Sequence, residues 1–191
     1  MKTVFVDVDS QLDFLYPAGA LYVPGAEHVV PAISRLNRLA AERGIPVIST
    51  VDAHSENDPE FAKWPPHCVL GTNGQHKPER TLLERCVVIP NRDGAFALDG
   101  AQQIIVEKQT TDVFLTHTVR RLIEMLGADH FVVYGVVTEI CVLFAARGLV
   151  ETGKQVTVVT DAVQTLKRED SDRALAEVCA AGGKLTTCDA V

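Results

Sequence analysis

Short runs rich in Val and Ile alternate with segments of helical hydrophobic period, and this alternation constrains the fold more than any other feature of the chain. The runs expected to form strands are 4–8, 45–51, 86–89, 104–106, 131–134 and 156–159, with 185–188 as a candidate edge strand. Helices are expected over 29–40, 119–126, 138–152 and 170–181. The pattern predicts an α/β fold, a three-layer, doubly wound arrangement in which helices cover both faces of a mostly parallel six-stranded sheet.

Length, charge and cysteine content limit what such a fold is expected to do. The 191 residues are enough for a single domain over 1–191, and their 47% hydrophobic content is ordinary for a globular protein. A net charge of −7 argues against nucleic acid and against an anionic membrane as partners. The five cysteines have no regular spacing, and no signal-peptide pattern is found. We therefore expect a cytoplasmic protein with reduced thiols.

Reactive residues follow several of the predicted strands. In open α/β sheets, ligands bind beyond the carboxyl ends of the strands, so residues that follow parallel strands gather at one edge. The segments in question are 9–14, 52–54, 107–108 and 136–141. They bring a carboxylate, two candidate metal ligands, a lysine and a thiol to the same edge. This coincidence indicates a catalytic site.

Cys141 carries the sharpest of these arguments. If Thr138 caps the helix expected to begin there, Cys141 lies in the first turn, where free N–H groups and the helix dipole favour the nucleophilic thiolate. The N–H groups of this turn and of Val137 would then be placed to hold an oxyanion. The alternative is an inert cysteine packed under the sheet.

Lys108 and Asp13 are the candidate partners of this thiol. The lysine would stabilise a thiolate by its charge, and the aspartate could take the thiol proton and later give it to a leaving group. The plainer alternatives are a surface lysine and a carboxylate that merely ends a strand. No histidine is obviously placed as the base, since His117 is expected to be a cap or surface residue at a helix start.

Asp52, His54 and His67 form a candidate metal site. Asp52 and His54 are two positions apart, so on an extended chain their side chains point the same way. His67 follows two prolines in a polar stretch over 55–80, which is too long for a plain connection and is interpreted as a functional loop. The set suits zinc, iron or manganese with open positions for water or substrate, and Glu60 is a candidate fourth ligand.

Several segments together resemble a known family. Residues 9–14 are similar to the motif D-x-Q-x-D-F, residues 52–54 to a D-x-H metal motif, and residues 64–72 to the block W-P-x-H-C-V-x-G-T. Residues 107–108 are similar to a lysine motif, and residues 135–142 to a nucleophile motif. On these residues the chain resembles the isochorismatase-like cysteine hydrolases, and among them most closely the nicotinamidases, or pyrazinamidases. The resemblance covers residues 4 to about 165.

The resemblance implies a catalytic triad of Asp13, Lys108 and Cys141, and an oxyanion hole formed by the N–H groups of Val137 and Cys141. It also implies a non-proline cis peptide bond between Val136 and Val137. The implied reaction is amide hydrolysis through a cysteine thioester, with nicotinamide converted to nicotinate and ammonia.

The resemblance further implies how a substrate would be held. Phe14 and Trp64 are at the positions whose aromatic rings clasp the substrate ring. One divalent metal ion, most simply zinc, would bind at Asp52, His54 and His67 and position the substrate. The expected substrates are small amides such as nicotinamide and pyrazinamide, and the expected assembly is a homo-oligomer.

The chain departs from the family pattern at a few positions. Ala53 and Ser55 stand where tryptophan and proline are usual, and Glu139 stands where Asp or Asn is common. The segment between His54 and His67 is also rearranged. These departures bear on the identity of the amide more than on the chemistry.

Three other functions are compatible with parts of the pattern. A metal-independent amidase of the same family would act on a carbamoyl or ureido compound with the same three catalytic residues. A vinyl-ether hydrolase of the isochorismatase type would lack the nucleophilic cysteine, so Cys141 argues against it. A non-enzymatic module that binds metal or senses oxidation would not need an acid, a lysine and a thiol at one edge.

Overall fold

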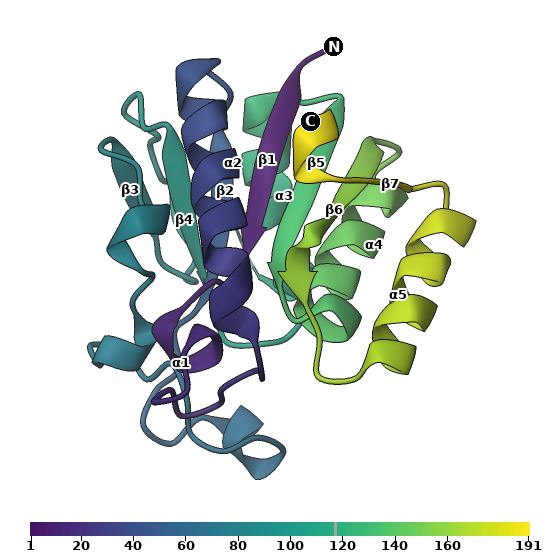
Figure 1. Cartoon of the computed structure of the whole chain (residues 1–191). Helices are drawn as coiled ribbons and strands as arrows, with labels where there is room; N and C mark the ends of the chain where they lie inside the picture. The colour runs from purple at the N-terminus through teal and green to yellow at the C-terminus, as the bar shows by residue number, and fades with distance from the viewer. Residues whose placement is uncertain (117) are drawn as a thin grey trace.

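The computed structural model describes residues 1–116 and 118–191, so His117 lies outside the described residues. Its strands form one parallel sheet in the order β3-β4-β2-β1-β5-β6-β7 (Figure 1). They are β1 (Thr3–Val8), β2 (Val47–Asp52), β3 (Cys86–Ile89), β4 (Gln103–Lys108), β5 (His130–Val136), β6 (Gln155–Gln164) and β7 (Lys184–Thr186). The α/β class is confirmed, but the sheet has seven strands instead of six, because the candidate edge strand around Leu185 does pair with β6.

Helices cover both faces of the sheet, with α2 crossing one face and α3 and α4 the other (Figure 1). The α-helices are α1 (Leu12–Leu15), α2 (Val30–Glu42), α3 (Val119–Leu126), α4 (Leu143–Glu151) and α5 (Arg168–Ala180). Short turns of other helix types are η1 (Ala26–Val29), η2 (Pro59–Ala62), η3 (Asn73–Gln75), η4 (Glu79–Thr81), η5 (Val113–Leu115), η6 (Thr138–Val142) and η7 (Cys188–Ala190). The apolar stripe that predicts α2 is buried at Ile33, Leu36 and Ala40. Burial of Ile33 and of Leu36 contributes roughly 1.5–3 kcal/mol each, because their large apolar side chains leave water.

The carboxyl ends of the central strands are level with one another. Asp52 at the end of β2 lies in register with Lys108 at the end of β4, and Val8 of β1 lies in register with Gly135 of β5. Gly135 has a φ of 120°, and a Cβ there would lie 2.1 Å from the Val8 carbonyl oxygen, so this close approach of the two strands requires glycine. The register therefore brings the residues that end these strands to one place.

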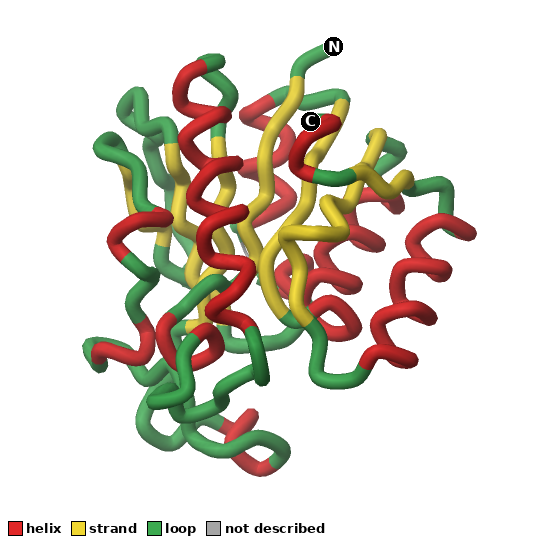
Figure 2. The backbone as a smooth tube through the Cα atoms, in the orientation of Figure 1, coloured by secondary structure: helices red, strands yellow, loops and turns green. Residues whose placement is uncertain are grey.

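The stretch expected to be a functional loop folds beyond this edge, where most of the irregular structure gathers at the lower end of Figure 2. It is fastened by backbone contacts: Leu12 N–H donates to the His76 carbonyl at 2.8 Å, and His54 pairs with Val69 in an isolated bridge. Among the helices of the described residues, none is long and apolar enough to cross a membrane.

Candidate active site

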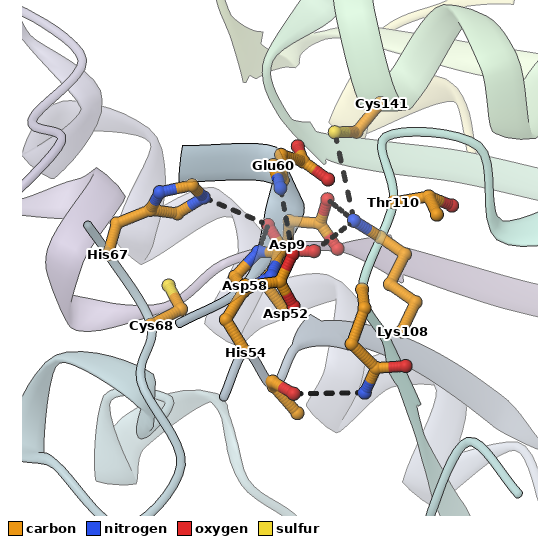
Figure 3. Close-up of polar contacts among 12 residues, drawn as sticks. Asp9, Asp52, His54, Asp58, Glu60, His67, Cys68, Lys108, Thr110 and Cys141 are labelled. Carbon is orange, nitrogen blue, oxygen red and sulfur yellow. Dashed lines mark hydrogen bonds and ion pairs between the residues drawn. The ribbon is translucent and has the colours of Figure 1, made fainter. Parts of the chain in front are cut away.

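Lys108 is at the centre of a buried group of charges at the sheet edge (Figure 3). Its side chain is 1% exposed, and its Nζ lies 2.8 Å from Oδ2 of Asp9, donates to Oδ1 of Asp52 and lies 3.9 Å from Sγ of Cys141. Burial would by itself lower the pKa of this ammonium, but the carboxylates of Asp52 and Asp9 raise its pKa well above the ordinary value. Lys108 therefore stays charged between two carboxylates and a thiol.

Asp9 is the carboxylate that lies beside both Lys108 and Cys141. It directly follows β1, and the Thr50 hydroxyl donates to its Oδ1 at 2.6 Å. Its Oδ2 has no well-formed hydrogen bond among the described residues, although Lys108 is within ion-pair distance. Burial raises the pKa of Asp9, and the charge of Lys108 opposes this shift. The carboxylate also interacts with the thiol of Cys141, which makes it a proton acceptor placed beside a nucleophile.

Asp13 lies elsewhere, which corrects the expectation that it joins Lys108 and Cys141. It belongs to α1, beyond the strand end, and its carboxylate accepts the N–H groups of Ala20 at 2.8 Å and Cys68 at 2.7 Å. The signal that identifies Asp9 was present in the sequence. Like Lys108, Asp9 stands directly at a strand end, whereas Asp13 comes four residues later.

Cys141 lies in the π-helical turn η6, which leads into α4. The expected cis peptide bond between Val136 and Val137 is present just before this turn. The expected cap at Thr138 is not formed, because the N-cap residue is Val137 and the Thr138 hydroxyl donates instead to the Gln164 carbonyl at 2.9 Å. The turn is therefore tied to the end of β6 by the side chain that was expected to cap it.

The protonation of Cys141 differs from the expectation of a resting thiolate. Burial raises the pKa of its thiol well above the ordinary value, and the carboxylates of Asp9 and Asp52 raise it further, while Lys108 opposes them. These surroundings favour the thiol over the thiolate. A base must take its proton when the sulfur attacks, and Asp9 is the base in contact with it.

Asp52, His54 and His67 converge as the sequence predicts. One ligand atom from each lies within 4.8 Å of the other two, and all three residues are buried. Oδ2 of Asp52 lies 3.9 Å from Nε2 of His54 and 3.7 Å from Nε2 of His67. A carboxylate oxygen and two imidazole nitrogens at these separations form a ligand set that suits zinc and related divalent ions.

Each of the two histidines has its Nε2 on the side of Asp52. Nδ1 of His67 lies 2.8 Å from the Pro65 carbonyl, which can only accept, so Nδ1 carries the hydrogen and Nε2 keeps a free lone pair. His54 is fully buried with Nδ1 3.1 Å from Asp58, yet neither ring nitrogen makes a well-formed hydrogen bond among the described residues. A bound cation would satisfy the orphaned Nε2 of His54. The residues therefore fit a divalent metal ion.

Gln11 holds the backbone of the metal-site aspartate, a role that the sequence did not reveal. Its side-chain Nε2 donates to the Asp52 carbonyl at 2.8 Å, and its Oε1 accepts the Asp52 N–H at 2.7 Å. Gln11 is itself fully buried, so the two hydrogen bonds fix Asp52 firmly to the segment that carries Asp9.

A cavity of about 110 Å³ opens beside both groups of residues, and Asp9, Asp52, His67 and Cys141 reach its wall. Phe14 and Trp64 line it, at the place expected for residues that clasp a ring. The remaining walls come mostly from apolar residues that the sequence analysis did not assign to the site: Leu21, Val23, Thr111, Val136, Ile140 and Leu166.

Glu60, the candidate fourth ligand, lies outside the cluster of three ligands and lines the cavity. Burial raises the pKa of its carboxyl, and the nearby charge of Asp52 raises it further. Its place in the cavity wall puts Glu60 within reach of whatever the cavity binds.

The comparisons with known proteins agree on one family. A family model described as the isochorismatase domain matches residues 3–190. The nicotinamidase of Escherichia coli (strain K12) is 28% identical over 217 aligned residues, which cover 94% of this chain and 92% of that protein.

Two solved structures place the fold. The pyrazinamidase of Pyrococcus horikoshii, in complex with zinc, is 27% identical with a TM-score of 0.81, and the match covers 98% of this chain and 99% of that one. The N-carbamoylsarcosine amidase of Thermoplasma acidophilum is 23% identical with a TM-score of 0.80, and the match covers 100% and 99% of the two chains. The second likeness concerns the fold alone.

Proposed function

Because the chain belongs to the isochorismatase domain family, as its motifs predict, we propose that it is an amidohydrolase that converts nicotinamide to nicotinate and ammonia. The expectation of an enzyme of this family is confirmed. One observation carries the proposed reaction: Asp9, Lys108 and Cys141 meet beside a cavity whose wall also contains metal-site residues. The nicotinamidase and the zinc-bound pyrazinamidase among its relatives support the choice of substrate.

Asp9 acts as the base of the first half-reaction. Its carboxylate takes the proton of the Cys141 thiol while Sγ forms a bond to the amide carbonyl carbon. Lys108 stays charged and holds Asp9 against the sulfur. When the carbon–nitrogen bond breaks, Asp9 gives the proton to the nitrogen, which leaves as ammonia, and a thioester remains on Cys141.

The second half-reaction uses the same carboxylate. Asp9 takes a proton from a water molecule whose oxygen attacks the thioester carbon, and it returns this proton to the sulfur when the carbon–sulfur bond breaks. The carboxylic acid is thereby released and the thiol restored. In both halves the N–H groups of Val137 and Cys141 hold the oxyanion. Removing one such donor typically lowers kcat about 10²–10³-fold.

Asp52, His54 and His67 would hold the metal ion, which would supply a Lewis acid for a ring nitrogen of the substrate. Phe14 and Trp64 enclose the ring from the cavity wall. Together these residues fix the direction in which the amide points, and such orientation can lower the barrier by several kcal/mol.

The decisive experiment replaces the nucleophile. We expect Cys141→Ala to reduce ammonia release from nicotinamide to background while its circular dichroism and unfolding curve stay close to the wild type. Cys188→Ala, at another buried cysteine far from the cavity, is the matched control and keeps its activity. Acid-quenched wild-type enzyme should carry the acyl group on Cys141 in mass spectrometry. Amidase activity that survives in Cys141→Ala would exclude the covalent mechanism.

The same assay separates the proposal from its alternatives. Ammonia release from carbamoyl or ureido compounds but not from nicotinamide, with no dependence on added metal, would identify a metal-independent amidase. A chain that releases ammonia from no amide, yet binds metal or oxidises at Cys141, would be a binding or sensing module.

A further inference from the structure

Asp13 is a buried carboxylate that the proposed reaction does not use. Each of its oxygens accepts one backbone N–H: Oδ1 from Ala20 at 2.8 Å and Oδ2 from Cys68 at 2.7 Å. Hydrogen bonds to an ionised acceptor are among the stronger ones in proteins. Asp13 therefore fastens the chain near Cys68, 55 positions further along, to the short helix that follows β1.

The N–H that Asp13 holds belongs to the peptide between His67 and Cys68. The carbonyl of Cys68 accepts the N–H of His54 at 3.1 Å, and the carbonyl of His54 accepts the N–H of Leu70 at 2.9 Å. Cys68 has a φ of 45°, a conformation that a non-glycine residue keeps only where its surroundings hold it. The backbone of Cys68 is thus the link between the two metal-site histidines, and Asp13 holds one end of that link (Figure 3 shows the neighbouring side chains).

Gly74 closes off the other side of this carboxylate. A Cβ at position 74 would lie 2.1–2.3 Å from Oδ2, Cγ and Oδ1 of Asp13. The backbone of Gly74 is not among the glycines with positive φ, so its conformation does not require glycine. What requires glycine there is the close approach to Asp13, and that approach confines the carboxylate to the two N–H groups.

We propose that Asp13 is a positioning residue of the metal site. It sets the separation of His54 and His67 by holding the His67–Cys68 peptide, and it touches neither the reacting sulfur nor the cavity. The inference rests on the proposed function in one respect, the binding of a divalent ion at the three ligands. Asparagine in this place keeps one acceptor but turns an NH₂ group toward the second N–H, so one of the two hydrogen bonds is lost.

The test measures metal binding directly on the purified, metal-stripped chain. Zn²⁺ affinity is measured by competition with a chromophoric chelator, and the geometry of the site by the visible absorption of bound Co²⁺. We expect Asp13→Asn to weaken Zn²⁺ binding about 10–100-fold and to change the Co²⁺ spectrum, as loss of a group that orients ligands typically does. Leu122→Ala, buried on α3, is the control that loses stability yet keeps the Zn²⁺ affinity and the Co²⁺ spectrum.

Gly74→Ala probes the same contact without changing the carboxylate. Its methyl group pushes Asp13 away from the Cys68 N–H, so we expect a loss of affinity here as well. In the double variant the two losses should not add, because both act through one contact. If Asp13→Asn does not fold, Gly74→Ala decides the question.

Unchanged Zn²⁺ affinity together with a wild-type Co²⁺ spectrum, in a folded Asp13→Asn or Gly74→Ala chain, would overturn the inference. A wild-type chain that binds neither ion would overturn the metal site itself, and with it the role of Asp13. A wild-type chain that binds metal normally but has no amidase activity would count against the proposed reaction. The Zn²⁺ affinities of the wild type and the variants would still decide whether Asp13 positions the metal site.

Discussion

Two buried aspartates lie two residues apart at the end of β1, and each faces a buried lysine. Asp7 has both oxygens occupied: Oδ1 accepts from Ser10 at 2.6 Å, and Oδ2 accepts from Asn37 at 3.0 Å and lies 2.9 Å from Nζ of Lys77. Asp9 has one oxygen occupied by the Thr50 hydroxyl, while its Oδ2 lies 2.8 Å from Nζ of Lys108 and has no well-formed hydrogen bond among the described residues. Asp9 lines the cavity and Asp7 does not.

Burial and charge therefore do not distinguish the two aspartates. They differ in how fully the second oxygen is hydrogen-bonded and in whether a cavity gives a substrate access to the carboxylate. A fully satisfied buried pair makes the structure rigid, whereas a carboxylate with hydrogen-bonding capacity left beside a thiol can accept a proton. The comparison predicts that variants of the Asp7 group change stability and that variants of the Asp9 group change turnover.

The largest effect should follow from Asp9→Asn. The amide cannot take the thiol proton, so we expect kcat/KM for nicotinamide to fall roughly 10²–10⁴-fold with folding retained. Asp7→Asn is the matched variant on the same strand, and its folded fraction should keep a kcat close to that of the wild type. Steady-state ammonia release and urea unfolding on both proteins measure the two quantities. Equal losses of kcat in the two folded variants would break the comparison.

The next effect in size concerns Lys77, whose side chain is 2% exposed beside Asp7. Lys77→Met removes the cation and leaves the buried Asp7 without it, so we expect the free energy of unfolding to fall by about 3–5 kcal/mol. Urea unfolding measures this loss. The exposed Lys2→Met is the control, with an expected change within about 0.5 kcal/mol. A normal unfolding free energy in Lys77→Met would show that the pair adds nothing to stability.

The sequence predicted the parts of this site that depend on local pattern. Val- and Ile-rich runs place the strands, and the rule that ligands bind at strand ends puts Lys108, Cys141 and Asp52 at one edge. The spacing of Asp52 and His54 was informative for the same reason, because an extended chain fixes the direction of alternate side chains.

The part that failed depends on contacts between distant segments. Asp9 and Asp13 belong to the same motif, and their different roles follow from partners far along the chain: Lys108 for the first, Cys68 for the second. The local pattern places Asp9 directly at a strand end, but it does not contain these distant partners. The rise in the pKa of Cys141 was also missed, because it comes from burial and two neighbouring carboxylates, which outweigh Lys108.

A smaller effect should follow from removing one metal-site histidine. His54→Ala deletes a ligand of the proposed substrate-orienting ion but leaves Asp9 and Cys141 in place, so we expect KM for nicotinamide to rise about tenfold or more, with a smaller change in kcat. The exposed His28→Ala serves as the control. A rise in KM with little change in kcat would show that, within one cavity, the metal-site residues bind the substrate while the Asp9 group carries out the reaction. An unchanged KM would contradict the binding role of the metal.

The smallest effect is expected at Glu139, which lies near the nucleophile as Asp9 does but has its oxygens occupied as Asp7 does. Glu139 lies two residues before Cys141, but its oxygens are occupied by the Thr165 hydroxyl at 2.7 Å and by the N–H groups of Leu166 at 2.9 Å and Lys167 at 3.2 Å. If occupied acceptors mean a structural role even beside the nucleophile, Glu139 acts only by holding Leu166 in the cavity wall.

Glu139→Gln keeps an oxygen for the N–H groups, so we expect KM to rise about two- to fivefold with kcat unchanged, equivalent to losing part of one hydrogen bond. Glu151→Gln, exposed at the end of α4, is the control and should change neither constant. A large fall in kcat at constant KM would mean that Glu139 influences the sulfur itself. In that case proximity to Cys141, and not remaining hydrogen-bonding capacity, would be what separates reactive from structural carboxylates in this protein.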